Sequence, residues 1–224
     1  PLNEEQKINA SGFSALNAEV RYLNPVLHVT FPRDTNGVKW ANRFTSVNKK
    51  REGVLTTTKI HPDSPVDPKK KANEEYTSEI DWTKVLFAAG PLLIPSVTVS
   101  KANLSREQII AEKTRLRSLF ASLANAETPA VAAEEGEMYS ITFTQESAVY
   151  EGAYCWADDR IYGVIYSPED HFALVQQLRD RGENGVTTIV VPSFVKPENI
   201  HVYSLAITAD GKITSNSVHM TLGA

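Results

Sequence analysis

The stretch "RIYGVIYSPEDHFALVQ", residues 160–176, decides the fold. It contains two runs of β-branched and aromatic residues, and such runs are typical of strands. Ser167-Pro168-Glu169-Asp170 separates them and is typical of a turn, because proline fixes φ and the acids stay solvated. The stretch therefore predicts two strands joined by a turn.

Glu169, Asp170 and His171 in the same stretch also admit a metal site or an acid–base pair. A calcium site needs several oxygen ligands at staggered positions, and only two adjacent acids are present here. Asp158 and Asp159, from the preceding turn, would complete a site only if the fold brought them close. A plain turn is the simpler interpretation, and the sequence predicts no metal ligands.

Strand-like runs continue on both sides of this stretch, from Met138 to the end of the chain. Asn184-Gly185 and Asp210-Gly211 are strong turn signals, because these residues tolerate positive φ. Short strands at this spacing favour a β-sandwich. The predicted strands are Tyr139–Thr144, Ala153–Trp156, Ile161–Tyr166, Phe172–Gln177, Thr187–Val191, His201–Thr208 and Ser217–Leu222.

Two regions are expected: a helix and strand region over residues 1–92 and a sandwich over residues 93–224. The sandwich begins with "IPSVTVSKA", and an amphipathic helix at about 105–124 is inserted after it. Ser105 and Gln108 fit the capping-box pattern that starts this helix. The overall fold class is mainly β with a helical N-terminal part, an α+β fold.

Apolar spacing in the first region predicts a helix over Asn3–Leu23 that Asn24-Pro25 ends. The run "PVLHVTF" that follows alternates like a strand, and Val38–Lys50 is a second, weaker helix. "YTSEIDWTKVLFAAG", from residue 76, returns to strand character.

Composition narrows the function classes. The net charge of −4 gives no basic footprint, so nucleic acid is not an expected partner. No apolar run reaches the roughly 18 residues of a membrane helix, so membrane insertion is not expected. Cys155 is the single cysteine and is expected to be an inert thiol.

Motifs that carry chemistry are absent from the sequence. It holds no G-x-S-x-G, P-loop or G-x-G-x-x-G pattern, and its histidines show no zinc spacing. His201 and His219 would be cross-strand neighbours if their strands paired. We therefore predict a non-enzymatic protein with no catalytic residue and no cofactor.

Aromatic residues leave two interpretations open. Tyr154, Trp156 and Tyr166 could form a platform that stacks on a sugar or contacts a protein ligand. The same residues are common in strands because they pack well on a pleated surface.

Several segments resemble a family of uncharacterised proteins found mainly in Bacteroidetes. They are "NEEQKINASGFSALNAEVRYLNPVLHVTF", "SEIDWTKVLFAAGPL", "DDRIYGVIYSPE" and "VTTIVVPSFVKPENIHVYSLAITADGKITSNSVHMTLG". The last segment is also similar to a fibronectin type III unit, with Tyr203, the turn at Asp210-Gly211, and alternating Val218, Met220 and Leu222. The resemblance implies an immunoglobulin- or fibronectin-III-like sandwich and no catalytic residue.

Members of that family usually have a glycine-rich, strand-like segment before the first helix, and this sequence starts at Pro1 without one. A sandwich that lost a strand would leave backbone groups unpaired, and a strand from another subunit could fill the gap. We therefore expect a pilus-like filament subunit, extracellular or at the cell surface, whose partners are copies of itself. The donor is either the segment near Pro1 or Ser217–Ala224, with Val218, Met220 and Leu222 as the intersubunit strand.

Two alternatives stay open. One is an adhesion module that binds a glycan or a protein through the aromatic residues named above. The other is a hydrolase with a dispersed site, which needs two acids, or an acid and a histidine, within hydrogen-bond reach in one pocket.

Overall fold

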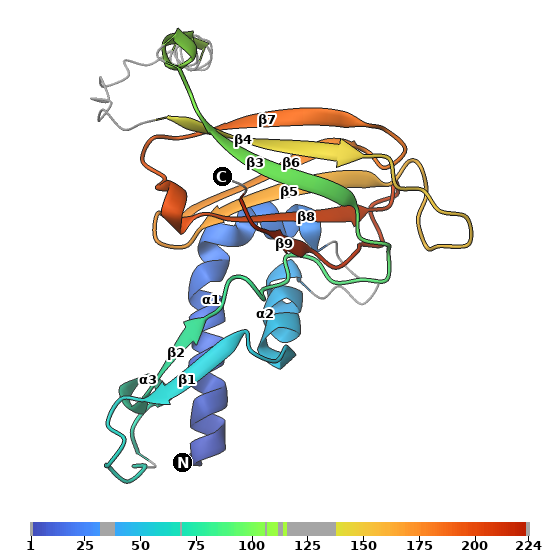
Figure 1. The fold of residues 1–224 in the computed structure, drawn as a ribbon. Coiled ribbons are helices and arrows are strands. Elements are labelled where there is room, and N and C mark those ends of the chain that lie inside the picture. Colours follow the sequence, from blue (N-terminus) through green and yellow to red (C-terminus); the bar gives the residue numbers. More distant parts are fainter. Residues whose placement is uncertain are drawn as a thin grey trace, which may run out of the picture.

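The computed structural model describes residues 2–31, 39–67, 69–105, 107–111, 114–115 and 138–222. Within these ranges the chain is a β-rich α+β fold with N-terminal helices and nine strands in three antiparallel sheets (Figure 1). The elements are α1 (Glu4–Thr30), α2 (Trp40–Lys50), β1 (Leu55–Lys59), α3 (Ala72–Glu75), β2 (Tyr76–Ile80), β3 (Ser96–Asn103), β4 (Tyr139–Glu146), β5 (Arg160–Ser167), β6 (Phe172–Asp180), β7 (Gly185–Val191), η1 (Pro197–Asn199), β8 (His201–Ile207) and β9 (Val218–Met220).

Three layers make up the body of the molecule. A four-stranded sheet, in the order β6-β5-β8-β9, lies between the helices and a three-stranded sheet in the order β3-β4-β7 (Figure 1). β1 and β2 form a separate hairpin that lies along the first half of α1. The two facing sheets confirm the mainly β character predicted for the C-terminal part.

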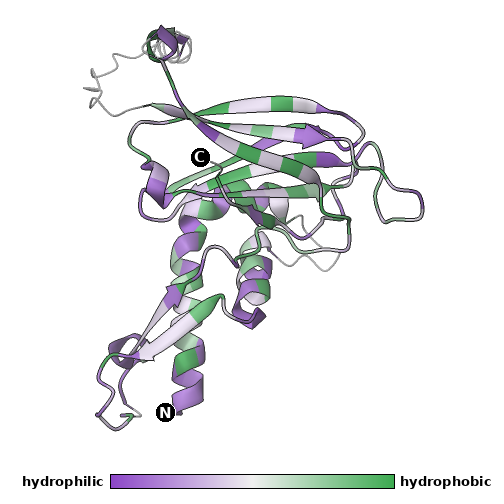
Figure 2. Cartoon of the chain, viewed as in Figure 1, coloured by the Kyte–Doolittle hydropathy of each residue, from purple (hydrophilic) through white to green (hydrophobic). Residues whose placement is uncertain are grey.

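β5, which covers the first half of the stretch 160–176, is buried on both faces. Val164 and Tyr166 point to the helices, while Ile165 points to the three-stranded sheet, and all three are fully buried. This two-sided burial explains why the strand is continuously apolar rather than alternating. Strands of the outer sheet alternate instead, as the banding of β3 and β7 in Figure 2 shows.

Close approach between the two sheets depends on Gly163 of β5. A methyl group at this position would lie 2.7 Å from ring carbons of Phe143 on β4. Glycine therefore lets the Phe143 ring lie directly against the β5 backbone.

The predicted end of the first helix at Asn24-Pro25 is wrong, because α1 continues through Pro25 to Thr30. Proline removes one backbone hydrogen bond and usually ends a helix. Here Val26 and Leu27 are fully buried in the core that the helices share with the four-stranded sheet, and that burial outweighs the missing bond. The "PVLHVTF" run is accordingly helical rather than a strand.

Both halves of the chain contribute to this core. It combines Leu16 and Leu23 of α1 and Phe87 with Tyr203 and Leu205 of β8. The residues expected to form separate regions, 1–92 and 93–224, are thus joined by one continuous apolar cluster.

Two other predicted elements have different outcomes. The segment Ala153–Trp156 is not a strand but part of a loop between β4 and β5, with a positive φ of 77° at Gly152. The inserted helix begins as predicted, because Ser105 Oγ accepts from the Gln108 N–H and Gln108 Oε1 accepts from the Ser105 N–H. Residues 107–111 and 114–115 are helical, and the rest of that predicted helix lies outside the described residues.

Candidate functional site

β9 is the edge strand of the four-stranded sheet. It pairs with β8 through Val202↔Met220, Tyr203↔His219 and Ser204↔Val218, and no described strand pairs with its other side. An open edge offers unpaired backbone groups to another extended segment. Val218 and Met220, two of the predicted intersubunit residues, are half-buried members of the chain's own sheet. Leu222, which follows them, packs against the apolar cluster between the two facing sheets.

The backbone of His219 faces this open side. Two residues earlier, the Ser217 N–H points away from β8 and donates to the Ala88 carbonyl. Backbone groups alternate along a strand, so the N–H and C=O of His219 point the same way as those of Ser217. Among the described residues no strand pairs with β9 on this side, so the His219 groups lie at the free edge.

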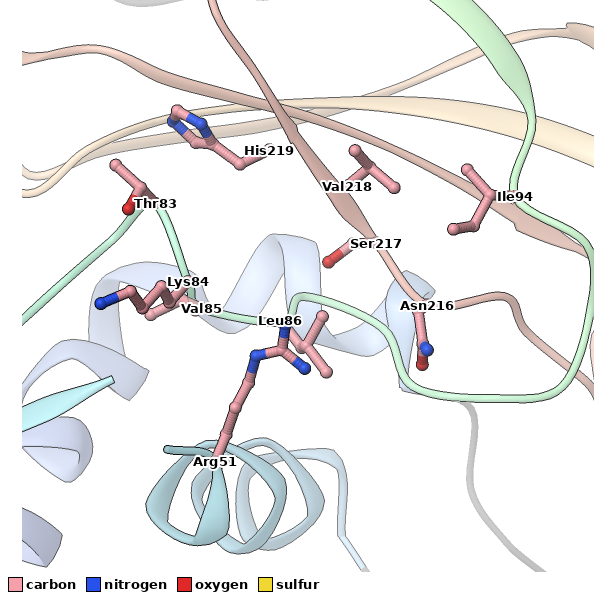
Figure 3. A pocket seen from close by; sticks show the side chains of 10 residues that line it. All are labelled: Arg51, Thr83, Lys84, Val85, Leu86, Ile94, Asn216, Ser217, Val218 and His219. Carbon is pink, nitrogen blue, oxygen red and sulfur yellow. The ribbon is translucent and has the colours of Figure 1, made fainter. Parts of the chain in front are cut away.

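A pocket of about 350 Å³ opens beside this edge. Figure 3 shows its three walls: β9 on one side, the segment from Thr83 to Leu86 on the second, and Ile94 on the third. Arg51, at the end of α2, reaches up into the space between them. The walls are fixed, because the Phe87 N–H donates to Ser217 Oγ at 2.8 Å. The pocket combines an open strand edge, apolar side chains and two cationic groups, Arg51 and Lys84.

Next to the pocket, His219 lies beside His201 of β8. The predicted proximity is confirmed, with 3.3 Å between His201 Nδ1 and His219 Nε2. Burial, together with the neighbouring imidazole and against the opposing effect of Asp81, lowers the pKa of His201 to about 4. Burial also lowers the pKa of His219. Both rings are therefore uncharged at neutral pH.

Among the described residues, no third ligand completes the histidine pair as a metal site. Throughout the described ranges, no group of three or more His, Cys, Asp or Glu is placed to hold a metal ion. In the same part of the chain, no hydrogen bond joins two acids, or an acid to a histidine.

The turn predicted at residues 167–170 is confirmed. Ser167 Oγ donates to Asp170 Oδ2 at 2.7 Å, and that oxygen also accepts from the Lys196 N–H. Burial alone would raise the pKa of Asp170, but these hydrogen bonds lower it overall. Asp158 and Asp159 lie at the other end of β5, roughly 25 Å away by its length of 8 residues. The two acidic turns therefore do not share a site.

The three predicted ligand-facing aromatic residues separate into two groups. Tyr166 is fully buried under α1, and its hydroxyl donates to Glu19, so its prediction as a ligand-facing residue is wrong. Tyr154 and Trp156 are 44% and 45% exposed on the β4–β5 loop. Their rings meet edge to face with centroids 4.9 Å apart. The loop therefore presents an ordered aromatic pair to solvent.

A buried ion pair holds this aromatic loop against the sandwich. Arg181 Nε and Asp159 Oδ2 lie 2.9 Å apart, and both side chains are 1% exposed. Asp159 Oδ2 also accepts from the Trp156 N–H at 3.0 Å. On the other side, Arg181 Nη2 donates to the Leu93 carbonyl, and the Leu93 N–H donates to the Tyr154 carbonyl. One network thus fixes the backbone of both aromatic residues.

Sequence reasoning missed Arg181 and the role of Asp159. Both occur in charged turns, Asp158-Asp159 and "RDRGENG", which look like ordinary solvated loops. Because they are 22 residues apart, no local pattern indicates that they meet. Asp210, another turn residue, lines a second pocket together with Trp156.

Comparisons with protein-family models, with curated proteins and with solved structures gave no match. Among the described helices, none is both long enough and apolar enough to cross a membrane.

Proposed function

We propose that this chain is a non-enzymatic structural subunit whose β9 edge receives an extended segment from a neighbouring copy. The observation that carries the proposal is the open side of β9, where the His219 backbone faces outward beside a pocket. Strand addition of this kind gains affinity from backbone hydrogen bonds, and adjacent pockets select the incoming side chains.

The donor is the segment that leads into α1. Of the two donors expected from the sequence, Ser217–Leu222 lies against its own sheet, which argues against its donation. The start of α1 lies at the end of the molecule far from β9 (Figure 1). A donor at one end and an acceptor at the other make a head-to-tail contact, which does not close on itself and builds filaments.

We propose further that the chain belongs to the uncharacterised Bacteroidetes family and is located outside the cell or at its surface. We also propose that its sandwich is immunoglobulin- or fibronectin-III-like. Facing antiparallel sheets of four and three strands support the last of these, since constant-type immunoglobulin domains divide their strands in this way.

A proline at position 219 tests the acceptor edge. His219→Pro removes the outward N–H and spares the bonds between β9 and β8, because those use the neighbouring residues. The matched control His219→Val keeps the N–H. We expect filaments or concentration-dependent oligomers, seen by electron microscopy and light scattering, to persist in His219→Val and to disappear in His219→Pro. Oligomers that survive His219→Pro, or a wild-type chain that stays monomeric at high concentration, would refute the proposal.

Cysteine cross-linking identifies the donor. In a Cys155→Ser background, Leu2→Cys and Asn216→Cys place one thiol at the start of α1 and one at the exposed rim of the pocket. Oxidation of the assembled double variant is expected to give a ladder of covalent oligomers, and neither single variant should do so. A product that stops at the dimer would show a closed contact and overturn the head-to-tail arrangement.

A further inference from the structure

A second pocket, of about 330 Å³, lies beside the exposed aromatic pair and shares no residue with the pocket at β9. Trp156 lines one part of this pocket, and Ala209 and Ile213 of the β8–β9 connection contribute further apolar surface. Asp158 and Asp210 line it as well. An aromatic ring, an apolar floor and carboxylate acceptors thus meet in one concave place.

Trp156 is held there rather than simply exposed. Its backbone N–H donates to the Asp159 carboxylate, which the buried Arg181 fixes in turn. Tyr154 contacts the indole edge to face and fixes its orientation.

Two polar atoms of the ion pair make no hydrogen bond. Among the described residues, Asp159 Oδ1 and Arg181 Nη1 are buried without a hydrogen-bond partner. Buried polar atoms without partners cost stability, so a fold that keeps them invites a functional explanation. Asp159 is also one of the residues that line the pocket. Positioning the pocket and its tryptophan is the explanation that these contacts support.

The carboxylate of Asp210, which also lines the pocket, is held in place by hydrogen bonds as well. Asp210 Oδ1 accepts from Thr208 Oγ1 at 2.7 Å and from the Lys212 N–H at 3.1 Å. These bonds, with the Lys212 ammonium 3.1 Å from Oδ2, lower the pKa of Asp210 to about 2. The carboxylate is 55% exposed and stays ionised, so its remaining lone pairs are free to accept from a ligand.

We propose that this pocket binds a neutral carbohydrate, with one pyranose ring stacked on Trp156 and its hydroxyls donating to Asp158 and Asp210. The apolar C–H face of a sugar matches an aromatic ring, and its hydroxyl groups match fixed carboxylates. A sugar acid would bring a negative charge toward the two carboxylates and is disfavoured by repulsion. The site would let an assembled subunit attach to a glycan surface, and it does not depend on assembly.

Glycan binding by the intact chain tests the site. The probe is an array of neutral hexose and pentose oligosaccharides with sialylated and uronic-acid counterparts, followed by calorimetry on the strongest neutral binder. We expect binding to neutral glycans only. Trp156→Ala is expected to weaken the affinity at least about tenfold, and Asp210→Asn to weaken it several-fold. Binding that prefers the acidic glycans, or a wild-type chain that binds no glycan, would overturn the proposal.

A matched control separates a site from general stickiness. Tyr150, 59% exposed on the same loop, does not line the pocket, so Tyr150→Ala should bind as well as wild type. Circular dichroism and the unfolding midpoint establish that each variant is folded. Equal losses in Tyr150→Ala and Trp156→Ala would contradict the assigned pocket. The His219→Pro variant should keep full glycan affinity, which distinguishes failure of this site from failure of strand addition.

Discussion

Breaking the buried Arg181–Asp159 pair is expected to destabilise the protein strongly. Both side chains are 1% exposed, so neither charge can be hydrated once its partner is removed. Asp159→Asn leaves the guanidinium unpaired, and Arg181→Met leaves the carboxylate unpaired. Removing one member of a buried pair typically costs about 3–5 kcal/mol, and we expect each single variant to lose that much free energy of unfolding.

The double variant provides the sharper measurement. With both Asp159→Asn and Arg181→Met in place, no buried charge is left without a partner. The combined loss should therefore be smaller than the sum of the two single losses, by about 1–3 kcal/mol. Urea denaturation followed by circular dichroism measures these differences. With a slope of about 3 kcal/mol per molar, each single variant should unfold roughly 1–1.7 M earlier than wild type.

An exposed pair provides the control. Lys84→Met makes the same cation-to-thioether change in the Lys84–Asp81 pair, whose side chains are 52% and 36% exposed. Surface pairs contribute about 0–1 kcal/mol, so this variant should unfold close to wild type. Single variants at the buried pair that cost no more than this control, or losses that add without coupling, would refute the reasoning.

Three further predictions concern the stability contributed by the core and by the histidine pair. Gly163→Ala should cost about 1–3 kcal/mol, because the new methyl group would overlap Phe143, and adding Phe143→Leu should recover part of the loss. Tyr203→Phe should cost about 1–3 kcal/mol in a urea titration, because the buried hydroxyl donates to a backbone carbonyl at 2.5 Å. Between pH 7 and 4 the free energy of unfolding should fall as pH drops, because burial and His219 hold the pKa of His201 near 4 while the unfolded chain takes up its proton near pH 6.5. His201→Gln should flatten this dependence, and a slope equal to that of wild type would contradict the assignment.

The sequence predicts the sandwich strands well where local signals agree. β5 and β6 are strongly apolar and a proline-containing turn separates them, so both their existence and their connection are predictable. Ser105 and Gln108 likewise predict the start of the inserted helix, because they form a local capping pattern. In these cases the side chains that determine the element lie within a few residues of each other.

Features that depend on distant contacts were not predictable. Pro25 is a local helix breaker, and only burial of the residues after it reveals that α1 continues. Tyr166 and Trp156 look alike in the sequence, but one faces α1 from a central strand and the other stands on a loop. Arg181 gives no local sign of a partner. Each of these depends on tertiary packing.

The continuity of α1 has a mechanical consequence. This helix of 27 residues, about 40 Å long, contacts the β1–β2 hairpin near its start and β6 near its end. A load applied to the hairpin therefore reaches the sandwich in part along this helix, which acts as a rod. Pro25 is the position at which that rod lacks a hydrogen bond, so bending would concentrate there. Pulling on the N-terminal end should flex the molecule at this residue before any strand separates.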